Sequence, residues 1–281
     1  MPAKILSYYK TVNIFNSIAL SRPNSFGVED GFRFGEKGTH SSRTMMLEEL
    51  RLLLSAALGA MDKSEYARAV LEDNCLGKRT LSTRKLSLQR LSELYGLDSK
   101  ILYFKILRDL WNISDANQPL LALLLSLTRD PLLRVSATSV LETPIGKEFA
   151  RQSMTDALTE ETEGRFNEST LDKIVRNASS TWTQSGHLEG RARKFRTKVH
   201  ATPVVCAFAL FIADSLGLRG QGLFDSPWGK VLDLDSADFR ELADDAKRMG
   251  FLNIKSIGTI IDVSFPQFLE GKNRGFIHGT Y

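Results

Sequence analysis

Residues 169–200, "STLDKIVRNASSTWTQSGHLEGRARKFRTKVH", change from a helical to a strand-like pattern within one short segment. The first half spaces apolar residues three and four apart, which is typical of an amphipathic helix, and Gly186 marks its end. The second half alternates apolar and basic residues after a turn at Glu189 and Gly190, which predicts a β-hairpin. We therefore expect a helix followed by a hairpin, the arrangement of a winged-helix unit.

The predicted helix over 169–185 has one apolar and one polar face. Ser169 is expected to cap it by accepting a hydrogen bond from the amide of Asp172. The apolar stripe consists of Leu171, Ile174, Val175, Ala178 and Trp182. The polar face is read as lacking an acid, and its amide and cationic groups suit base edges and phosphates. The candidates for groove contacts on this face are Lys173, Arg176, Asn177 and Gln184.

The predicted hairpin concentrates positive charge. Residues 187–200 hold five Lys and Arg residues against one acid, so this segment's net charge of +4 equals that of the whole chain. Phe195, Thr197 and Val199 are expected to point inward, so that the alternating bases point outward toward a nucleic-acid backbone. The alternative is an ordinary solvated charged face. The predicted phosphate contacts are Arg191, Arg193, Lys194, Arg196 and Lys198.

Helical periodicity prevails in the N-terminal half, from Met45 onward. The apolar runs at 119–127 and 204–213 are shorter than the roughly 20 residues of a membrane span, so they predict buried core helices. A second basic cluster falls on a helix that Thr80 or Ser82 would cap, where backbone amides also favour phosphate. Intrahelical ion pairing is the competing interpretation. The members of this cluster are Lys78, Arg79, Arg84, Lys85 and Arg90.

These patterns predict a mainly α fold with small β-hairpins: a helical N-terminal domain followed by winged-helix-like C-terminal units. We expect an irregular N-terminal arm (1–42), a helical domain with a basic capped helix (43–141), a linker (142–168) and a winged-helix-like C-terminal domain (169–281). A second helix, capped by Ser236 and followed by a hairpin, is expected near the C-terminus. Its outward face is acidic, so the helix over 236–249 is expected to pack within the protein or bind a protein partner.

The sequence carries no recognisable catalytic or cofactor motif, so we expect a non-enzymatic protein without a cofactor or a bound metal. Its four histidines, His40, His187, His200 and His278, lack metal-ligand spacing. Carboxylates at Asp233, Asp235 and Asp238 would suit a magnesium-dependent nuclease, but helix capping explains them more simply.

The expected compartment follows from the cysteines and the N-terminus. Cys75 and Cys206 lie far apart and form no disulfide framework, which is typical of a reducing cytoplasm. The N-terminus shows no secretory signal pattern. We therefore expect a cytoplasmic protein with no membrane association.

Three stretches of this sequence form a recognisable set: "LEELRLLLSAAL" (47–58), "VLEDNCLGKRTLSTRKLSLQRLSELYGLD" (70–98) and "IVRNASSTWTQSGHLEG" (174–190). Together they resemble the BrxA family of bacterial BREX phage-exclusion systems, and the resemblance spans roughly residues 44–200. It implies a cytosolic, non-enzymatic, helix-rich DNA-binding component of a phage-defence system. From residues and resemblance together we expect binding to double-stranded DNA, mainly through phosphates. The alternatives are a protein–protein adaptor of a defence complex, a magnesium-dependent nuclease and an RNA-binding protein.

Overall fold

The computed structural model describes residues 15, 28–35, 37–60, 62–258 and 260–269. Contacts within the chain divide it into two compact units, residues 1–200 and 201–281. In the described part each unit is mainly helical and holds one two-stranded antiparallel sheet. The predicted mainly α fold with small β-hairpins is therefore confirmed.

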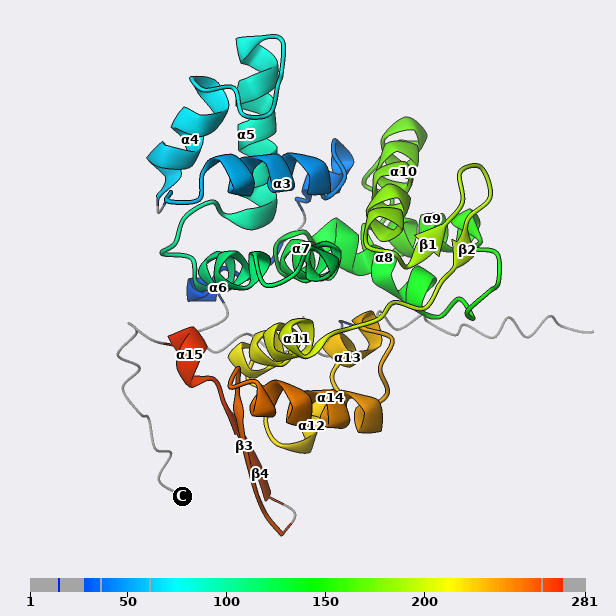
Figure 1. Cartoon of the computed structure of the whole chain (residues 1–281). Helices are drawn as coiled ribbons and strands as arrows, with labels where there is room; N and C mark the ends of the chain where they lie inside the picture. Colours follow the sequence, from blue (N-terminus) through cyan, green and yellow to red (C-terminus); the bar gives the residue numbers. More distant parts are fainter. Residues whose placement is uncertain (1–14, 16–27, 36, 61, 259, 270–281) are drawn as a thin grey trace, which may run out of the picture. The chain divides into compact units, whose positions relative to one another are not determined.

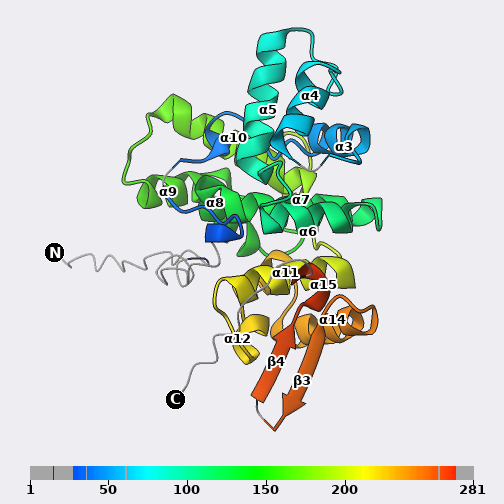
Figure 2. The same cartoon turned by 90° about the vertical axis from the view of Figure 1, so that its left-hand side faces the viewer.

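The first unit contains two groups of helices that both meet α7 (Figure 1). Figures 1 and 2 show α3, α4 and α5 together in one group and α8, α9 and α10 in the other. The elements are η1 (Thr39–Ser41), α3 (Leu47–Ala56), α4 (Lys63–Leu71), α5 (Leu81–Tyr95), α6 (Leu102–Trp111), η2 (Asp115–Asn117), α7 (Gln118–Arg129), α8 (Pro131–Leu141), α9 (Arg151–Glu161), α10 (Glu168–Gln184), β1 (Leu188–Glu189) and β2 (Phe195–Arg196).

Helix α7 is the core of the first unit, as its continuous apolar run predicts. Every residue from Leu120 to Arg129 is buried, and the helix packs on α5, α6 and α8. A helix buried on all sides needs no polar face, which explains the absence of an amphipathic pattern here. Asp130 then ends α7 and caps α8 by accepting hydrogen bonds from the amides of Leu132 and Leu133.

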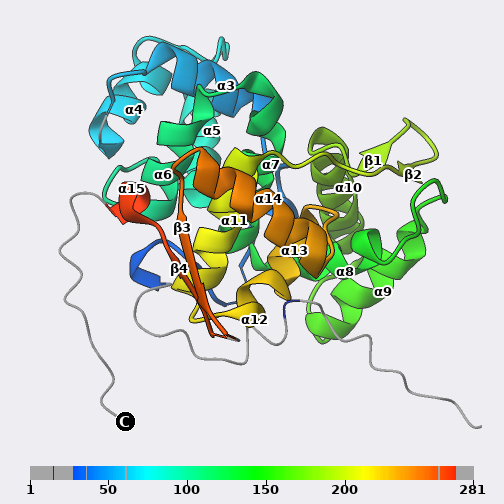
Figure 3. The same cartoon turned by 60° about the horizontal axis from the view of Figure 1, so that its bottom comes forward.

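The second unit is built around α11. This helix begins at Pro203 after the capping residue Thr202 and is buried along nearly its whole length, as predicted. It packs on α13 and α14, and Figure 1 shows β3 and β4 as a ribbon that extends away from these helices. In Figure 3, with the bottom turned forward, the same ribbon overlaps the helices in projection. The elements are α11 (Pro203–Ser215), α12 (Gln221–Phe224), α13 (Pro227–Val231), α14 (Ser236–Arg248), β3 (Asn253–Ile257), β4 (Ile260–Ser264) and α15 (Pro266–Leu269).

The predicted domain boundary differs from the one in the structure. Residues 142–168 are not a linker, because α9 lies within them and buries Met154 and Leu158 against its neighbours α8 and α10. The segment 169–200 belongs to the first unit, so 169–281 is not one domain. A polar, charged surface helix has the composition of a linker, and only two buried side chains reveal its packing.

Part of the predicted N-terminal arm is integral to the first unit. Residues 1–14 and 16–27 lie outside the described residues. Beyond them, Phe32, Thr39 and His40 are buried, and the amide of Arg33 donates to the carbonyl of Thr128 at 2.9 Å. The stretch is irregular, as expected, yet it is not peripheral.

Over the residues that the structure describes, no helix combines the length and the apolar character needed to cross a membrane.

Candidate nucleic-acid interface

Helix α10 presents its predicted apolar stripe to the core of the first unit. Ile174, Val175, Ala178 and Trp182 are buried, and the indole Nε1 of Trp182 donates to Ser136 Oγ at 2.8 Å. The helix begins one residue earlier than predicted, because Asn167 caps it in place of Ser169. The predicted apolar stripe of this helix is therefore confirmed, and its predicted capping residue is wrong.

Residues 40–47 contact the polar face of α10 at its middle and at its C-terminal end. Asn177 Nδ2 donates to the His40 carbonyl at 2.9 Å, and Gln184 Oε1 accepts from the Leu47 amide at 3.3 Å. The prediction that Asn177 and Gln184 face a DNA groove is wrong, because both side chains are partly buried against residues 40–47. Amide groups on a helix face satisfy a neighbouring backbone as readily as a base edge, so the sequence pattern does not separate the two roles.

The N-terminal turns of α10 are exposed and carry mixed charge. Arg176 Nε lies 3.0 Å from Asp172 Oδ2, and Arg151 binds the same carboxylate. The expectation of an acid-free face is therefore wrong. Lys173 is exposed, and no ion pair joins it to any described residue. Of the four predicted groove-facing residues, Lys173 is the one whose charge stays available.

The hairpin forms at the predicted turn, with Leu188 opposite Arg196 and Glu189 opposite Phe195. Strand β2 is covered on its other side as well, because the Phe149 amide donates to the Lys194 carbonyl at 2.7 Å and the Arg196 amide donates to the Lys147 carbonyl at 2.9 Å. The strand is thus central, and residues 146–149 flank it.

Beside residues 146–149, the side chains of β2 point the opposite way from the prediction: Arg196 is buried, and Phe195 is only half-buried. The Arg196 side chain is only 2% exposed, and its guanidinium donates to the carbonyls of Val140 and Thr197. Phe195, expected to be inside, is half-buried. The prediction of Arg196 as an outward phosphate contact is wrong. Period-two alternation predicts that neighbouring side chains point to opposite faces but does not reveal which face is covered.

Two more hairpin bases have partners within the protein. Arg193 Nε lies 2.8 Å from Glu148 Oε1, and this hydrogen bond raises the pKa of Arg193. Lys194 Nζ donates to Thr183 Oγ1 at 2.8 Å, and partial burial lowers its pKa. Arg191 and Lys198 are exposed, and no ion pair joins either to a described residue. The hairpin thus offers two free charges where the sequence predicts five.

The basic cluster around α5 divides in the same way. Thr80 caps the helix as predicted. Lys78 Nζ lies 3.0 Å from Glu49, Arg84 donates to the Leu71 carbonyl at 2.9 Å, and Arg90 pairs with Glu93 at 2.7 Å. Of these three, only Arg90 pairs within its own helix, as the competing interpretation of intrahelical ion pairing expects; Lys78 pairs with a residue of α3, and Arg84 binds a backbone carbonyl. The other two, Arg79 and Lys85, are exposed without an ion pair to any described residue.

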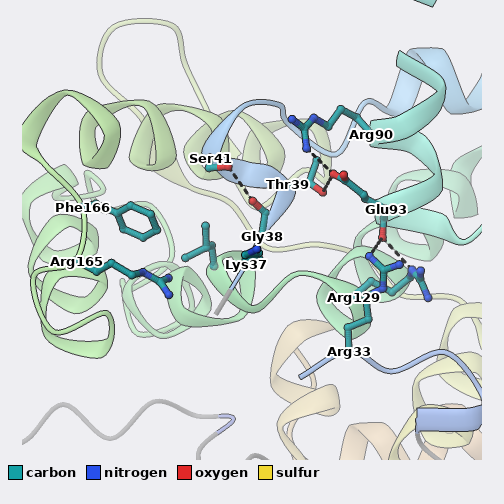
Figure 4. Close-up of a pocket in the computed structure, with 11 residues that line it drawn as sticks. Arg33, Lys37, Gly38, Thr39, Ser41, Arg90, Glu93, Arg129, Arg165 and Phe166 are labelled. Atoms are coloured by element: carbon teal, nitrogen blue, oxygen red, sulfur yellow. Dashed lines mark hydrogen bonds and ion pairs between the residues drawn. The ribbon is translucent and has the colours of Figure 1, made fainter. Parts of the chain in front are cut away.

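The structure adds a cationic cavity, which we call the arginine cavity, that the sequence did not reveal. It has a volume of about 610 Å³, and Figure 4 shows Arg165 and Phe166 on one side and Arg90, Glu93 and Arg129 on the other. The N-terminal segment and η1 lie between the two sides. The lining residues are Arg33, Lys37, Gly38, Thr39, Ser41, Arg90, Glu93, Arg129, Leu132, Arg165 and Phe166.

Charge in the arginine cavity is unbalanced. Five of the lining residues are Lys or Arg, and Glu93 is the single acid among them. Glu93 already accepts from Thr39 Oγ1 at 3.0 Å and pairs with Arg90. Burial opposes ionisation of Glu93, but hydrogen bonds from Arg90, Gln89 and Thr39 outweigh it and lower the pKa. Burial, and then the charge of Arg33, lowers the pKa of Arg129 to about 9.

Sequence reasoning missed the cavity because its cations come from four separate places. Arg33 and Lys37 lie in the predicted arm, Arg129 ends a core helix, and Arg165 lies in the predicted linker. Arg90 alone was a candidate. The one available signal was Arg129 itself, a charged residue at the end of an otherwise apolar run.

Three of the side chains considered for metal chemistry, those of His40, His187 and Asp235, have structural roles, and His278 lies outside the described residues. His40 and His187 are fully buried. Asp235 caps α14 by accepting from the amides of Ala237 and Asp238, one residue before the predicted cap Ser236. Within the described residues, no group of three or more His, Cys, Asp or Glu side chains is placed to hold a metal ion.

Comparison with known proteins gave no relative: no protein-family model and no curated protein matches this chain.

Proposed function

We propose that the chain is a non-enzymatic protein that binds double-stranded DNA in the bacterial cytoplasm, as a component of a BREX-type phage-defence system. One observation supports DNA binding above the others. Five predicted contact residues are exposed and have no ion pair with any described residue: Arg79, Lys85, Lys173, Arg191 and Lys198. The assignment to phage defence rests on the resemblance to the BrxA family.

Unpaired surface cations suit a DNA backbone for a simple physical reason. A Lys or Arg that binds a phosphate releases condensed counterions, whereas one already held by a carboxylate must first give up that partner. Arg193, which pairs with Glu148, and Arg176, which pairs with Asp172, therefore contribute less than Arg191 or Lys198. Replacing the paired bases Arg193 and Arg176 should therefore change duplex affinity little.

The test is a fluorescence-anisotropy titration of a labelled duplex with the full chain. We expect Arg191→Ala/Lys198→Ala to weaken binding about tenfold, since each phosphate contact is worth roughly 0.5–1.5 kcal/mol. The melting temperature should stay unchanged, because both side chains are exposed. A matched control is Lys230→Ala/Lys247→Ala, which removes two exposed bases from the second unit. Equal affinity for the two double variants would contradict the proposal.

Helix α14 supports a second candidate function, docking onto a partner protein. Asp238 and Glu241 are exposed on this helix, and Ile257 and Ile260 at the end of the β3–β4 ribbon are 81% and 71% exposed. Acidic groups disfavour DNA, and exposed apolar side chains suit a protein surface. If docking is the main role, Ile257→Ser/Ile260→Ser abolishes co-purification of defence-system proteins, while duplex affinity is negligible in the parent chain as well.

A further inference from the structure

We propose that the arginine cavity is a binding site for a terminal phosphate group, a phosphate monoester such as that of a nucleotide or of a nucleic-acid end. The proposal does not depend on duplex binding by the exposed cations of the surface. It rests on the identity, burial and hydrogen bonding of the residues that line the cavity.

Arg129 is the most buried cation of the cavity, and among the described residues its guanidinium has no acidic hydrogen-bond partner. Its side chain is 5% exposed, and its guanidinium donates to the carbonyls of Glu93 at 3.0 Å and Gly31 at 2.8 Å. Neutral carbonyls fix the position of the guanidinium without cancelling its charge. A buried cation is costly unless an anion balances it. The direction of its pKa shift is consistent with an uncompensated charge, because both burial and Arg33 lower it.

Arg90 adds an unused donor. Its Nη1 is taken by Glu93, but its Nε is buried and has no hydrogen-bond partner among the described residues. Buried donors without partners are rare, and each calls for an explanation such as a missing ligand. Arg33 and Lys37 add positive charge at the same cavity. Planar guanidinium groups with fixed donors are the usual partners of phosphate oxygens.

The opposite wall offers a flat surface beside the cations. The guanidinium carbon of Arg165 lies 4.6 Å from the ring centre of Phe166, so the two groups stack. Figure 4 shows this pair facing the segment that carries Lys37 and Ser41. Bases stack on aromatic rings and on guanidinium planes, so this wall suits the nucleoside part of a phosphorylated ligand. The cavity volume of about 610 Å³ also lies within the range of roughly 300–1,000 Å³ that is typical of small-molecule sites.

The concave shape favours a terminal phosphate over a phosphate within a duplex. An internal phosphodiester is flanked by sugar on both sides and presents one negative charge along a convex backbone. A monoester carries up to two charges on three free oxygens, as a phosphorylated side chain does. It can therefore engage several cations of the arginine cavity at once.

The experiment is isothermal titration calorimetry on the full chain with inorganic phosphate, AMP and adenosine. A second set compares a short single-stranded oligonucleotide with and without a 5′-phosphate. We expect AMP and inorganic phosphate to bind and adenosine to bind at least about tenfold more weakly, because the phosphate makes the charge-assisted hydrogen bonds. Preference for AMP over the 5′-phosphorylated strand identifies a nucleotide as the source, and the reverse preference identifies a nucleic-acid end.

Two variants locate the site. Lys37→Ala and Arg165→Ala remove exposed members of the lining, and Lys100→Ala removes an exposed base of the first unit that does not line the cavity. We expect each of the first two to lower AMP affinity severalfold and the control to leave it unchanged. Arg90→Gln tests the inner wall, with circular dichroism as a check of folding. Arg191→Ala/Lys198→Ala should weaken duplex binding and leave AMP binding intact, which separates the two proposals.

The proposal is overturned if neither phosphate nor AMP binds the folded parent chain. It is also overturned if AMP binds with equal affinity to Lys37→Ala, Arg165→Ala, Arg90→Gln and the parent.

Discussion

A buried hydrogen-bond network of the first unit is centred on His40. Its ring Nδ1 lies 2.7 Å from Asp130 Oδ2, and its Nε2 lies 2.7 Å from Thr181 Oγ1. All three residues are buried, and the His40 amide also donates to Asp130 at 2.9 Å. These contacts join η1, the start of α8 and the last turn of α10 at one point, directly beside the lining of the arginine cavity. The positions of the residues that line this cavity therefore depend on His40, Asp130 and Thr181, which do not line it.

Replacing Asp130 by Asn tests this network. Asp130 accepts hydrogen bonds from the His40 amide and from the amides of Leu132 and Leu133 that begin α8, so its replacement weakens the bonding of several buried donors. Leaving a buried donor without an acceptor typically costs about 1–3 kcal/mol. We expect Asp130→Asn to lower the free energy of unfolding by about that amount in urea denaturation at pH 7. As a control, Asp109→Asn removes a half-exposed carboxylate that pairs with Lys105, and it should cost less than about 1 kcal/mol.

The pKa of Asp130 also predicts how the stability of the fold decreases at low pH. Burial alone would raise the pKa of Asp130, but the charge and hydrogen bonds of His40 and the amide of Leu133 lower it overall, below 3.8. A carboxyl with a lower pKa in the folded state stabilises the fold above its unfolded pKa, and this contribution is lost as the pH falls through the folded value. The parent chain should therefore lose more stability than Asp130→Asn as the pH falls below about 4. Parallel pH profiles would contradict this.

Gly38 offers a steric test at the same place. A Cβ at this position would lie 2.1 Å from Asp130 Oδ1 and 2.8 Å from Leu132 Cγ, although φ is −128°, which any residue adopts. The effect of Gly38→Ala is therefore a clash, and we expect a loss of about 1–3 kcal/mol in unfolding free energy. Gly59→Ala is the matched control, because nothing lies within 4 Å of its Cβ position. Equal stability of the two variants would show that the segment around Gly38 relaxes freely.

At the scale of elements, the sequence predicts the helices and buried faces that depend on the local spacing of apolar residues. The buried helices α7 and α11 follow from continuous apolar runs, and the stripe of α10 follows from its spacing. Contacts that come from distant parts of the chain were not predictable. Residues 146–149 flank β2, and residues 40–47 occupy the polar face of α10. The candidate site is the least predictable part, because the availability of a Lys or Arg depends on partners that lie far away in the sequence.

Strand β2 gives the clearest test of this distinction. Arg196 and Lys198 were predicted as equivalent outward bases, yet Arg196 is buried and Lys198 is exposed. We expect Arg196→Ala to destabilise the protein by about 2–4 kcal/mol, because it leaves a cavity and removes donors from the buried carbonyls it now satisfies. Lys198→Ala should leave the melting temperature nearly unchanged and weaken duplex binding. Thermal denaturation of both variants checks the first effect, and anisotropy of the stable variant checks the second.

For the whole molecule, net positive charge is confined to the first unit. The second unit holds 8 of the 37 Lys and Arg residues and 10 of the 33 acids, so its net charge is −2 and that of the first unit is +6. Like-charged DNA is repelled by the second unit and attracted by the first. The same division leaves the acidic α14 and the apolar end of the β3–β4 ribbon available for a protein.

This division predicts how duplex affinity depends on salt. Each phosphate that the protein neutralises adds about 0.9 to the slope of log affinity against log salt concentration. If five exposed cations bind phosphates, the slope for the parent chain is about −4.5, and Arg191→Ala/Lys198→Ala reduces its magnitude by about 1.8. Removing Lys230 and Lys247 from the second unit should leave the slope unchanged. Anisotropy titrations between 50 and 200 mM salt, roughly the range over which such slopes are measured, provide the measurement. A slope near zero would contradict binding through phosphates, and an equal reduction in both double variants would place DNA contacts outside the first unit's exposed cations.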